Sequence, residues 1–221
     1  MTPCAAGTWA GPSMLEVKNL NAWWGAAQAL FDVSLAVNAG ELVVLQGLNG
    51  AGKSTLLQAI MGIGSRVTGV ISCEKNSIQD WPAHRRAQAG LGYVAEDRRL
   101  FAGLTVQENL LIAARGDKTG NLEKMLAIFP ALKTMLSRRA SQMSGGEQQM
   151  LAIARTLMSS PKLLLLDEPC EGIAPMLVDA IAEALLTLKA QGMPMLVAEQ
   201  NQILASRADR VITLVAGQVA I

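Results

Sequence analysis

The chain has 221 residues and a formal net charge of +1; 51% of its residues are hydrophobic and only 4% aromatic. This length allows one large or two small domains with a core built mainly from aliphatic side chains. The balanced charge and the lack of any lysine or arginine block argue against nucleic acid as a partner.

The first residues and the cysteines bear on where the chain works. Residues 1–13 lack the basic head and apolar centre of a signal peptide, so we expect a flexible extension. The most apolar run, residues 163–166, is too short to span a bilayer. Cys4, Cys73 and Cys170 follow no metal-binding spacing, which is typical of free thiols in a reducing compartment. Together these features predict a soluble, cytoplasmic chain.

Hydrophobic periodicity predicts strands and helices in alternation. Segments 15–20 and 29–37 alternate like half-buried antiparallel strands, and the apolar run at 42–46 is typical of a strand buried on both faces. Further strands are expected at 70–73, 91–95, 162–168, 193–199 and 211–216. Helices are expected at 56–62, 82–89, 105–115, 122–129, 131–138, 147–158 and 174–191, with a short one before the last strand.

The order of these elements predicts an α/β fold. Strand and helix alternation at both ends favours a mostly parallel sheet with helices packed on it, preceded by an antiparallel β subdomain. Between residues 97 and 158 helical patterns dominate, which indicates an inserted α-helical subdomain. We therefore expect residues 14–221 to form a single domain.

The segment GLNGAGKST fits the phosphate-binding pattern GxxxxGK[ST] at every fixed position, between a predicted buried strand and a helix. Its glycines let backbone N–H groups wrap phosphates, its lysine reaches the β- and γ-phosphates, and its serine hydroxyl can bind Mg²⁺. The alternative is a glycine-rich turn with an incidental lysine. The predicted nucleotide-binding residues are Gly47, Asn49, Gly50, Ala51, Gly52, Lys53, Ser54 and Thr55.

Two acids follow the buried run KLLLL, at the strand end where open α/β sheets place their ligands. Asp167 can hold Mg²⁺ in a P-loop enzyme. Glu168 can orient or deprotonate the attacking water, and we expect it to act together with Lys53 in catalysis. The alternative is that one of the acids only caps the strand end.

The stretch MSGGEQQM, at 143–150, has a serine and two glycines ahead of a predicted helix. Free backbone N–H groups at a helix N-terminus, with glycines that allow close approach, can hold an anion. The chain already has one phosphate-binding loop, so this second motif needs a separate explanation.

The phosphate-binding loop, the LLLLDE strand and the SGG motif between them resemble the ATP-binding subunit of an ABC transporter. The resemblance extends from about residue 14 to the end of the chain. It implies that two ATPase domains meet head to tail, and that each SGG motif closes over the γ-phosphate held by the other chain. Ser144, Gly145, Gly146 and Glu147 would then complete a partner's site, with ATP and Mg²⁺ as cofactors.

Other positions can be compared with the same family. Trp24 precedes a glycine where the family places an aromatic that stacks on adenine, and its neighbour Trp23 could instead be a core residue. Glu96 stands where most members have a glutamine that contacts Mg²⁺ and the water. Gln200 falls at the position of a histidine that touches the γ-phosphate, and Ala174 near that of an aspartate. These departures argue against fast hydrolysis by the family's standard route.

The departures also resemble one ATPase of the hydrophobic (branched-chain) amino-acid uptake group, which includes transporters for urea and short amides. The resemblance implies an ATP-hydrolysing subunit of an importer at the cytoplasmic face of the inner membrane. Its implied partners are a second ATPase, identical or different, membrane permease subunits and a periplasmic solute-binding protein. The alternatives are a urea or short-amide importer, an ABC exporter, a P-loop kinase or GTPase, and a non-transport ABC protein.

The segment Arg98–Asn109 contains the apolar residues Phe101, Leu104 and Val106, although a loop is expected to be polar. We expect the membrane partner to dock there. The alternative is that these side chains pack inward. His84, the only histidine, lies on a polar helical segment and is expected at the surface.

Overall fold

The computed structural model describes residues 13–220, and the first part of it is a four-stranded antiparallel sheet. Its strands are β1 (Ser13–Trp24), β2 (Ala27–Asn38), β4 (Arg66–Cys73) and β5 (Asn76–Ser77), in the spatial order β2-β1-β4-β5. In β1 the buried residues Leu15, Val17 and Leu20 face the core, with a register shift between the last two. The predicted antiparallel β subdomain is confirmed.

The predicted N-terminal extension needs one correction. Residues 1–12 lie outside the described part of the chain, but Ser13 already belongs to β1 and pairs with Asn38 of β2. The prediction that Ser13 belongs to a flexible extension is therefore wrong.

A six-stranded sheet forms the centre of the molecule. Its strands are β3 (Leu42–Gln46), β6 (Leu91–Val94), β7 (Leu163–Asp167), β8 (Met195–Ala198), β9 (Arg210–Val215) and β10 (Gln218–Val219), in the spatial order β10-β9-β3-β8-β7-β6. All neighbours pair in parallel except β9 and β10. Every residue of β7 is buried, which explains why its sequence is a continuous apolar run.

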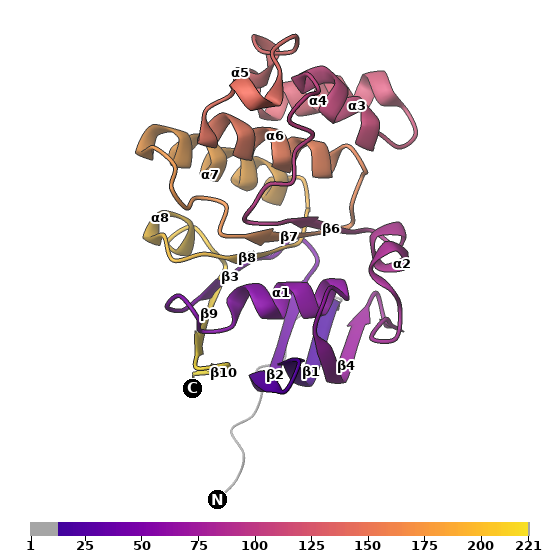
Figure 1. Cartoon of the computed structure of the whole chain (residues 1–221), viewed down its shortest axis with the longest axis vertical. Coiled ribbons are helices and arrows are strands. Elements are labelled where there is room, and N and C mark those ends of the chain that lie inside the picture. The colour runs from indigo at the N-terminus through magenta and orange to yellow at the C-terminus, as the bar shows by residue number, and fades with distance from the viewer. Residues whose placement is uncertain (1–12, 221) are drawn as a thin grey trace, which may run out of the picture.

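Helices cover both faces of this sheet (Figure 1). They are α1 (Lys53–Met61), α2 (Ala83–Gln88), α3 (Val106–Ala113), α4 (Lys118–Ile128), α5 (Pro130–Lys133), α6 (Gly145–Leu157), α7 (Pro175–Ala190) and α8 (Gln202–Ala205), with a 3₁₀ turn at Ala140–Gln142. Figure 1 shows α1 between the central and antiparallel sheets, and α6 and α7 on the opposite face.

The core divides at the central sheet because successive strand residues point to opposite faces. On one face Val44, Leu164 and Leu166 join a cluster with the buried residues of α3, α6 and α7. On the other face Val43 and Leu165 join a cluster with α1 and the antiparallel sheet. Each strand is therefore fixed from both sides, which holds the loops at its end in place.

One predicted helix is shorter than expected. The segment 131–138 is helical only as far as Lys133, where α5 ends. Beyond it the carbonyls of Leu136 and Arg138 accept hydrogen bonds from the backbone N–H groups of Gln107 and Val106 at the start of α3. These carbonyls cap another helix instead of continuing their own.

The sheet places three loops at one edge. The segments that follow β3, β7 and β8 leave from the carboxyl ends of neighbouring parallel strands, and an open α/β sheet binds ligands at such an edge. Within residues 13–220 no helix is long and apolar enough to cross a bilayer.

Candidate functional site

The loop between β3 and α1 is shaped by close packing. Gly47 and Gly52 have φ angles of 157° and 103°. A Cβ at Gly47 would collide with the carbonyl oxygen of Leu214, and a Cβ at Gly52 would lie 2.8 Å from the Leu30 side chain. No side chain caps the start of α1, so its first N–H groups are left for a ligand.

Lys53 points back into this loop. Its Nζ donates to the carbonyl oxygens of Gly47 at 2.8 Å and Leu48 at 3.3 Å. It also forms an ion pair of 2.9 Å with Oε1 of Glu168, and the two side chains are 3% and 7% exposed. Glu168 has a left-handed backbone (φ 48°), a strained conformation that is common at functional sites. The pair joins the loop after β3 to the loop after β7.

Asp167 is held by two hydroxyl groups. Ser54 Oγ donates to Oδ1 at 2.8 Å, and Tyr93 Oη donates to Oδ2 at 3.0 Å. Burial raises the pKa of Asp167, while the hydrogen bonds from Ser54 and Tyr93 partly oppose this shift. Burial, followed by the charge of Asp167, also raises the pKa of Tyr93. Sequence reasoning missed Tyr93, although its polar hydroxyl in a predicted buried strand was a usable signal.

A hollow of about 610 Å³ opens over these groups. Lys53, Ser54, Thr55 and three glutamates, Glu96, Glu168 and Glu171, are among its lining residues. The charge of Glu168 is the main cause that raises the pKa of Glu171, followed by partial burial. Glu171 is a second residue that the sequence did not single out, since its proximity to Glu168 depends on how the loop folds.

The oxygen atoms around Asp167 suit a magnesium ion. Within residues 13–220 no three His, Cys, Asp or Glu side chains converge into a protein-only metal site. Mg²⁺ usually takes only one or two protein carboxylates and completes its shell with water and substrate phosphate. A hydroxyl and a carboxylate 2.8 Å apart, with Glu96 across the same hollow, fit that requirement.

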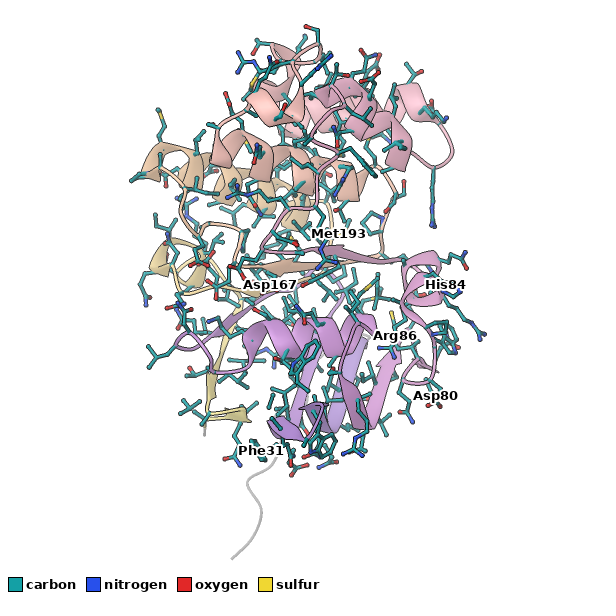
Figure 2. The ribbon with its side chains drawn as sticks, in the orientation of Figure 1. Phe31, Asp80, His84, Arg86, Asp167 and Met193 are labelled. Carbon is teal, nitrogen blue, oxygen red and sulfur yellow. The ribbon has the colours of Figure 1, made fainter. Side chains whose placement is uncertain are left out.

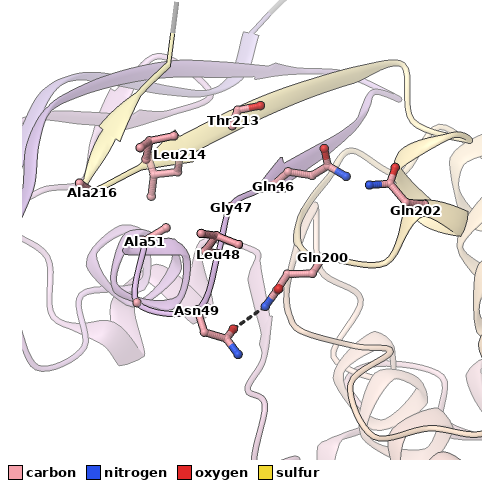
Figure 3. Close-up of a pocket in the computed structure, with 12 residues that line it drawn as sticks. Gln46, Gly47, Leu48, Asn49, Ala51, Gln200, Gln202, Thr213, Leu214 and Ala216 are labelled. Atoms are coloured by element: carbon pink, nitrogen blue, oxygen red, sulfur yellow. Dashed lines mark hydrogen bonds between the residues drawn. The ribbon is translucent and has the colours of Figure 1, made fainter.

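The buried carboxylate of Glu199 fixes the loop after β8 by hydrogen bonds. Glu199, 2% exposed, accepts hydrogen bonds from the backbone N–H groups of Cys170 (2.9 Å), Gln200 (2.8 Å) and Asn201 (3.0 Å). Figure 3 shows Gln200 donating from Nε2 to Oδ1 of Asn49 in the phosphate-binding loop. A second hollow, of about 580 Å³, lies beside this contact and is lined by β3, β9 and the same two loops.

The SGG motif lies at the start of α6. Ser144 Oγ accepts from the Glu147 N–H at 3.4 Å, and a Glu147 carboxylate oxygen accepts from the Ser144 N–H at 2.7 Å. Residues 144–147 line neither hollow at the phosphate-binding loop, as far as residues 13–220 show. The predicted site residues thus fall into two groups. One group surrounds the two hollows at the phosphate-binding loop, and the other is residues 144–147 at the start of α6.

The two adjacent tryptophans have different surroundings. Trp24 is 43% exposed, and its indole N–H donates to Thr55 Oγ1 at 3.3 Å. The half-buried Trp23 lies under Arg66, whose guanidinium carbon is 4.6 Å from the ring centroid. Trp24 is therefore the tryptophan beside the phosphate-binding loop.

Three further expectations concern the remaining residues. His84 is exposed, as predicted, and Figure 2 shows it on α2, away from Asp167. Phe101 is 50% exposed and Leu104 is half-buried, but Val106 is fully buried. The expectation that Val106 faces a partner is wrong, because it begins α3 and packs in the core. Ala174 is the residue that precedes α7.

The Lys53–Glu168 pair makes a prediction for the nucleotide-free chain. Lys53→Met should lower the free energy of unfolding by about 3–5 kcal/mol, because it leaves a buried carboxylate without its counter-charge. Adding Glu168→Gln should recover part of this loss. Denaturant unfolding measures both variants. The control is Lys18→Met, which removes an exposed pair with Glu16 and should cost under about 1 kcal/mol. A Lys53→Met loss no larger than that of the control would contradict a stabilising buried pair.

Comparison with known proteins adds independent findings. The chain is 42% identical to BraG of Pseudomonas aeruginosa, the "high-affinity branched-chain amino acid transport ATP-binding protein", over 93% of this chain and 91% of that protein. It is 35% identical to LivF of Archaeoglobus fulgidus, a "probable branched-chain amino acid transport ATP-binding protein", over 94% and 90% of the two chains.

The fold and the sequence family agree with these relatives. A dimeric ATP-binding cassette solved in a post-hydrolysis state with ADP and Pi superposes with a TM-score of 0.84 at 26% identity, covering 94% of this chain and 97% of that one. Residues 30–171, which include both loops that Lys53 and Glu168 join as well as the SGG motif, match the family described as "ABC transporter". The chain therefore belongs to the ABC transporter family, as one of its ATP-binding, ATP-hydrolysing subunits.

Proposed function

We propose that this chain powers an importer for branched-chain amino acids. The observation that carries this proposal is the 42% identity to BraG along nearly the full length of both chains. The other candidate substrates are urea and short amides, which the same subgroup resemblance allows. An exporter role has less support, because LptB of Haemophilus influenzae, named for lipopolysaccharide export, is 34% identical over 86% of this chain, against 42% over 93% for BraG.

The residues around the first hollow take the following roles in this proposal. The backbone N–H groups of residues 47–52 hold the β- and γ-phosphates, and Thr55 binds the nucleotide next to them. The exposed Trp24 ring stacks on adenine. Ser54, Asp167 and Glu96 hold Mg²⁺, which supplies positive charge to the phosphate oxygens when it is bound. Glu168 accepts the proton of the attacking water, and Gln200 orients the γ-phosphate from the other side.

The Lys53–Glu168 ion pair implies that substrate binding prepares the catalytic base. The Lys53 ammonium pairs with the Glu168 carboxylate at 2.9 Å. Incoming phosphates compete for the same ammonium, since they carry more negative charge than one carboxylate. When Lys53 turns to the phosphates, Glu168 loses its counter-charge and becomes available to accept a proton. The base is thus active only when a nucleotide is present.

The SGG motif completes a site in a second subunit in this proposal. Residues 144–147 lie away from the chain's own phosphate-binding loop, and their N–H groups at the start of α6 suit an anion. Ser144, Gly145, Gly146 and Glu147 close over the γ-phosphate of a partner ATPase. The exposed Phe101 (50%) and Ile112 (60%) offer an apolar surface to the membrane permease. The chain then works at the cytoplasmic face of the membrane, with a solute-binding protein on the other side.

The transported solute can be tested directly. The tagged chain is purified from membranes, its partners are identified by mass spectrometry, and the complex is reconstituted in vesicles with its solute-binding protein. We expect leucine, isoleucine or valine to stimulate ATP hydrolysis several-fold, whereas urea and acetamide at equal concentration do not. Stimulation by urea or acetamide alone, or co-purification with an exporter permease, would replace this proposal with the corresponding alternative.

The roles of Lys53 and Glu168 predict opposite effects on nucleotide binding. Lys53→Ala should abolish ATP binding, because it removes the cation that reaches the phosphates. Glu168→Gln should bind ATP at least as tightly as the wild type and accumulate a closed dimer, since it removes the proton acceptor together with the carboxylate that pairs with Lys53 and leaves the phosphate-binding groups in place. Titration with a fluorescent ATP analogue and size-exclusion chromatography give the two readouts. If both variants lose affinity equally, Glu168 is not the base.

The role of the SGG motif predicts a separation of binding from closure. Gly145→Asp should leave the ATP affinity of the isolated chain unchanged within about twofold, because the phosphate-binding loop lies elsewhere. The new carboxylate should abolish ATP-driven dimerisation and turnover, since it repels the incoming γ-phosphate. The assays are nucleotide titration and dimer formation in the Glu168→Gln background, with the co-purified partner ATPase present if the chain does not self-associate. Loss of ATP affinity in the monomer would show that the motif serves its own chain.

A further inference from the structure

Arg98 lies in a strained loop between β6 and α3. Arg98 and its neighbour Arg99 both have left-handed backbones, with φ angles of 59° and 47°. Non-glycine residues rarely adopt this conformation, and two in a row persist only where the surroundings fix them. Arg155 of α6 provides that fixation, since its guanidinium donates to the carbonyl oxygens of Arg99 at 2.8 Å and Arg98 at 3.2 Å.

The same loop directs the Arg98 side chain to the start of α6. Its Nε donates to Oε1 of Gln149 at 3.0 Å, and Nη1 donates to Oε1 of Gln148 at 3.4 Å. Gln149 is 1% exposed, and its amide nitrogen has no hydrogen-bond partner within residues 13–220. A buried amide with an unused donor is costly, so Gln149 is better explained as a support that orients Arg98 than as a satisfied core residue.

The guanidinium lies beside the first residue of α6. A Cβ placed on Gly145 would be 3.4 Å from Nη1 of Arg98 and 3.5 Å from Nη2. The Arg98 guanidinium therefore lies within van der Waals contact of the position that a side chain at residue 145 would take. The only two side chains that hold it by hydrogen bonds among the described residues are neutral amides.

The charges around the start of α6 do not cancel. Glu147 is offset by Arg138 at 3.6 Å. Arg98 has no carboxylate within ion-pair distance in the part of the chain that the structure describes, whereas Arg99 pairs with Asp97 at 3.0 Å. Arg98 is therefore a cation without a paired carboxylate beside a helix N-terminus that already favours anions.

We propose that Arg98 helps to bind the nucleotide of the partner ATPase. Its guanidinium, held beside Gly145 by Gln148 and Gln149, supplies the positive charge that draws in the terminal phosphate when the two subunits close. This inference rests on the proposed two-chain site and adds to it a cation outside the SGG motif. Because Arg98 is two residues from Glu96, one loop reaches the metal side of its own site and the phosphate of the partner's site.

The competing explanation is that Arg98 only ties the loop to α6. Both explanations predict weaker ATP-driven dimerisation when Arg98 is removed. They differ in whether the positive charge at this position is what dimerisation requires. A phosphate-binding cation should be largely replaced by lysine, and its contribution should weaken at high salt. A structural tie depends on the planar guanidinium and on neutral acceptors, so lysine should not replace it and salt should matter little.

The experiment uses Glu168→Gln, which is expected to accumulate the ATP-bound dimer, as the background. Arg98→Gln and Arg98→Lys are each combined with Glu168→Gln. The control is Arg99→Gln in the same background, because the Arg99 side chain is exposed and paired with Asp97. ATP affinity of the monomer, ATP-driven dimerisation and thermal unfolding are measured at about 0.1 M and about 1 M salt, between which screening shortens from about 10 Å to about 3 Å. The co-purified partner ATPase is added if the chain does not self-associate.

We expect Arg98→Gln to bind ATP normally as a monomer and to dimerise about ten- to a hundredfold more weakly at low salt, the size of one lost charge-assisted hydrogen bond. The deficit should shrink at high salt, Arg98→Lys should retain most of the closure, and Arg99→Gln should match the background. Equal deficits at both salt concentrations, or a lysine variant as poor as glutamine, would overturn the proposal in favour of a structural tie.

The outcome also separates this inference from the proposed function. If Gly145→Asp abolishes closure while Arg98→Gln does not, the two-chain site stands and the role of Arg98 is wrong. If the Glu168→Gln background forms no ATP-driven dimer, alone or with its partner, the two-chain site and this inference fail together.

Discussion

The buried ion pair between Lys53 and Glu168 is the contact on which the rest of the site depends. It connects the loops that follow β3 and β7, and these loops carry most of the polar groups of the first hollow. The pair is possible because the two strands are fixed at a constant spacing by β8 between them and by apolar cores on both faces of the sheet. A rigid sheet thus positions an ammonium and a carboxylate that would be costly to bury apart.

The second constraint is the distribution of anion-binding groups. The phosphate-binding loop and the start of α6 each lie at a helix N-terminus, yet residues 144–147 are not among the lining residues of the two hollows at the phosphate-binding loop. The chain belongs to the ABC transporter family, and one of its structural relatives is a dimeric cassette. A second subunit is therefore the simplest explanation for two anion-binding motifs in one chain.

Long-range hydrogen bonds join parts of the molecule that are distant in the sequence. Glu199 links the loops after β7 and β8 through three backbone N–H groups, and Arg98 and Arg155 link the loop after β6 to α6. Arg86, which is 2% exposed, donates to the carbonyl oxygens of Ala59 and Ile60 and so secures the far end of α1. Glu199, Arg155 and Arg86 satisfy backbone groups that apolar packing alone would leave unpaired, whereas Arg98 donates to two side-chain amides.

Short-range patterns in the sequence identified the local parts of this protein. The phosphate-binding loop, the buried strand before Asp167 and the serine and glycines ahead of α6 could all be recognised, because each depends on residue types at a fixed short spacing and on hydrophobic period. Most strands and helices were predicted for the same reason. The failures at Val106 and at segment 131–138 arose where the chain packs against another element, and local pattern does not record such contacts.

Which of these parts meet depends on the three-dimensional fold. Tyr93 reaches Asp167, Glu171 approaches Glu168, and Arg98 lies beside Gly145, although the partners in the first and third contacts are far apart in the sequence. The fold also leaves residues 144–147 out of the lining of the two hollows at the phosphate-binding loop. These contacts follow from strand order and from the packing of helices on the sheet, which bring distant segments together. No spacing along the chain specifies them.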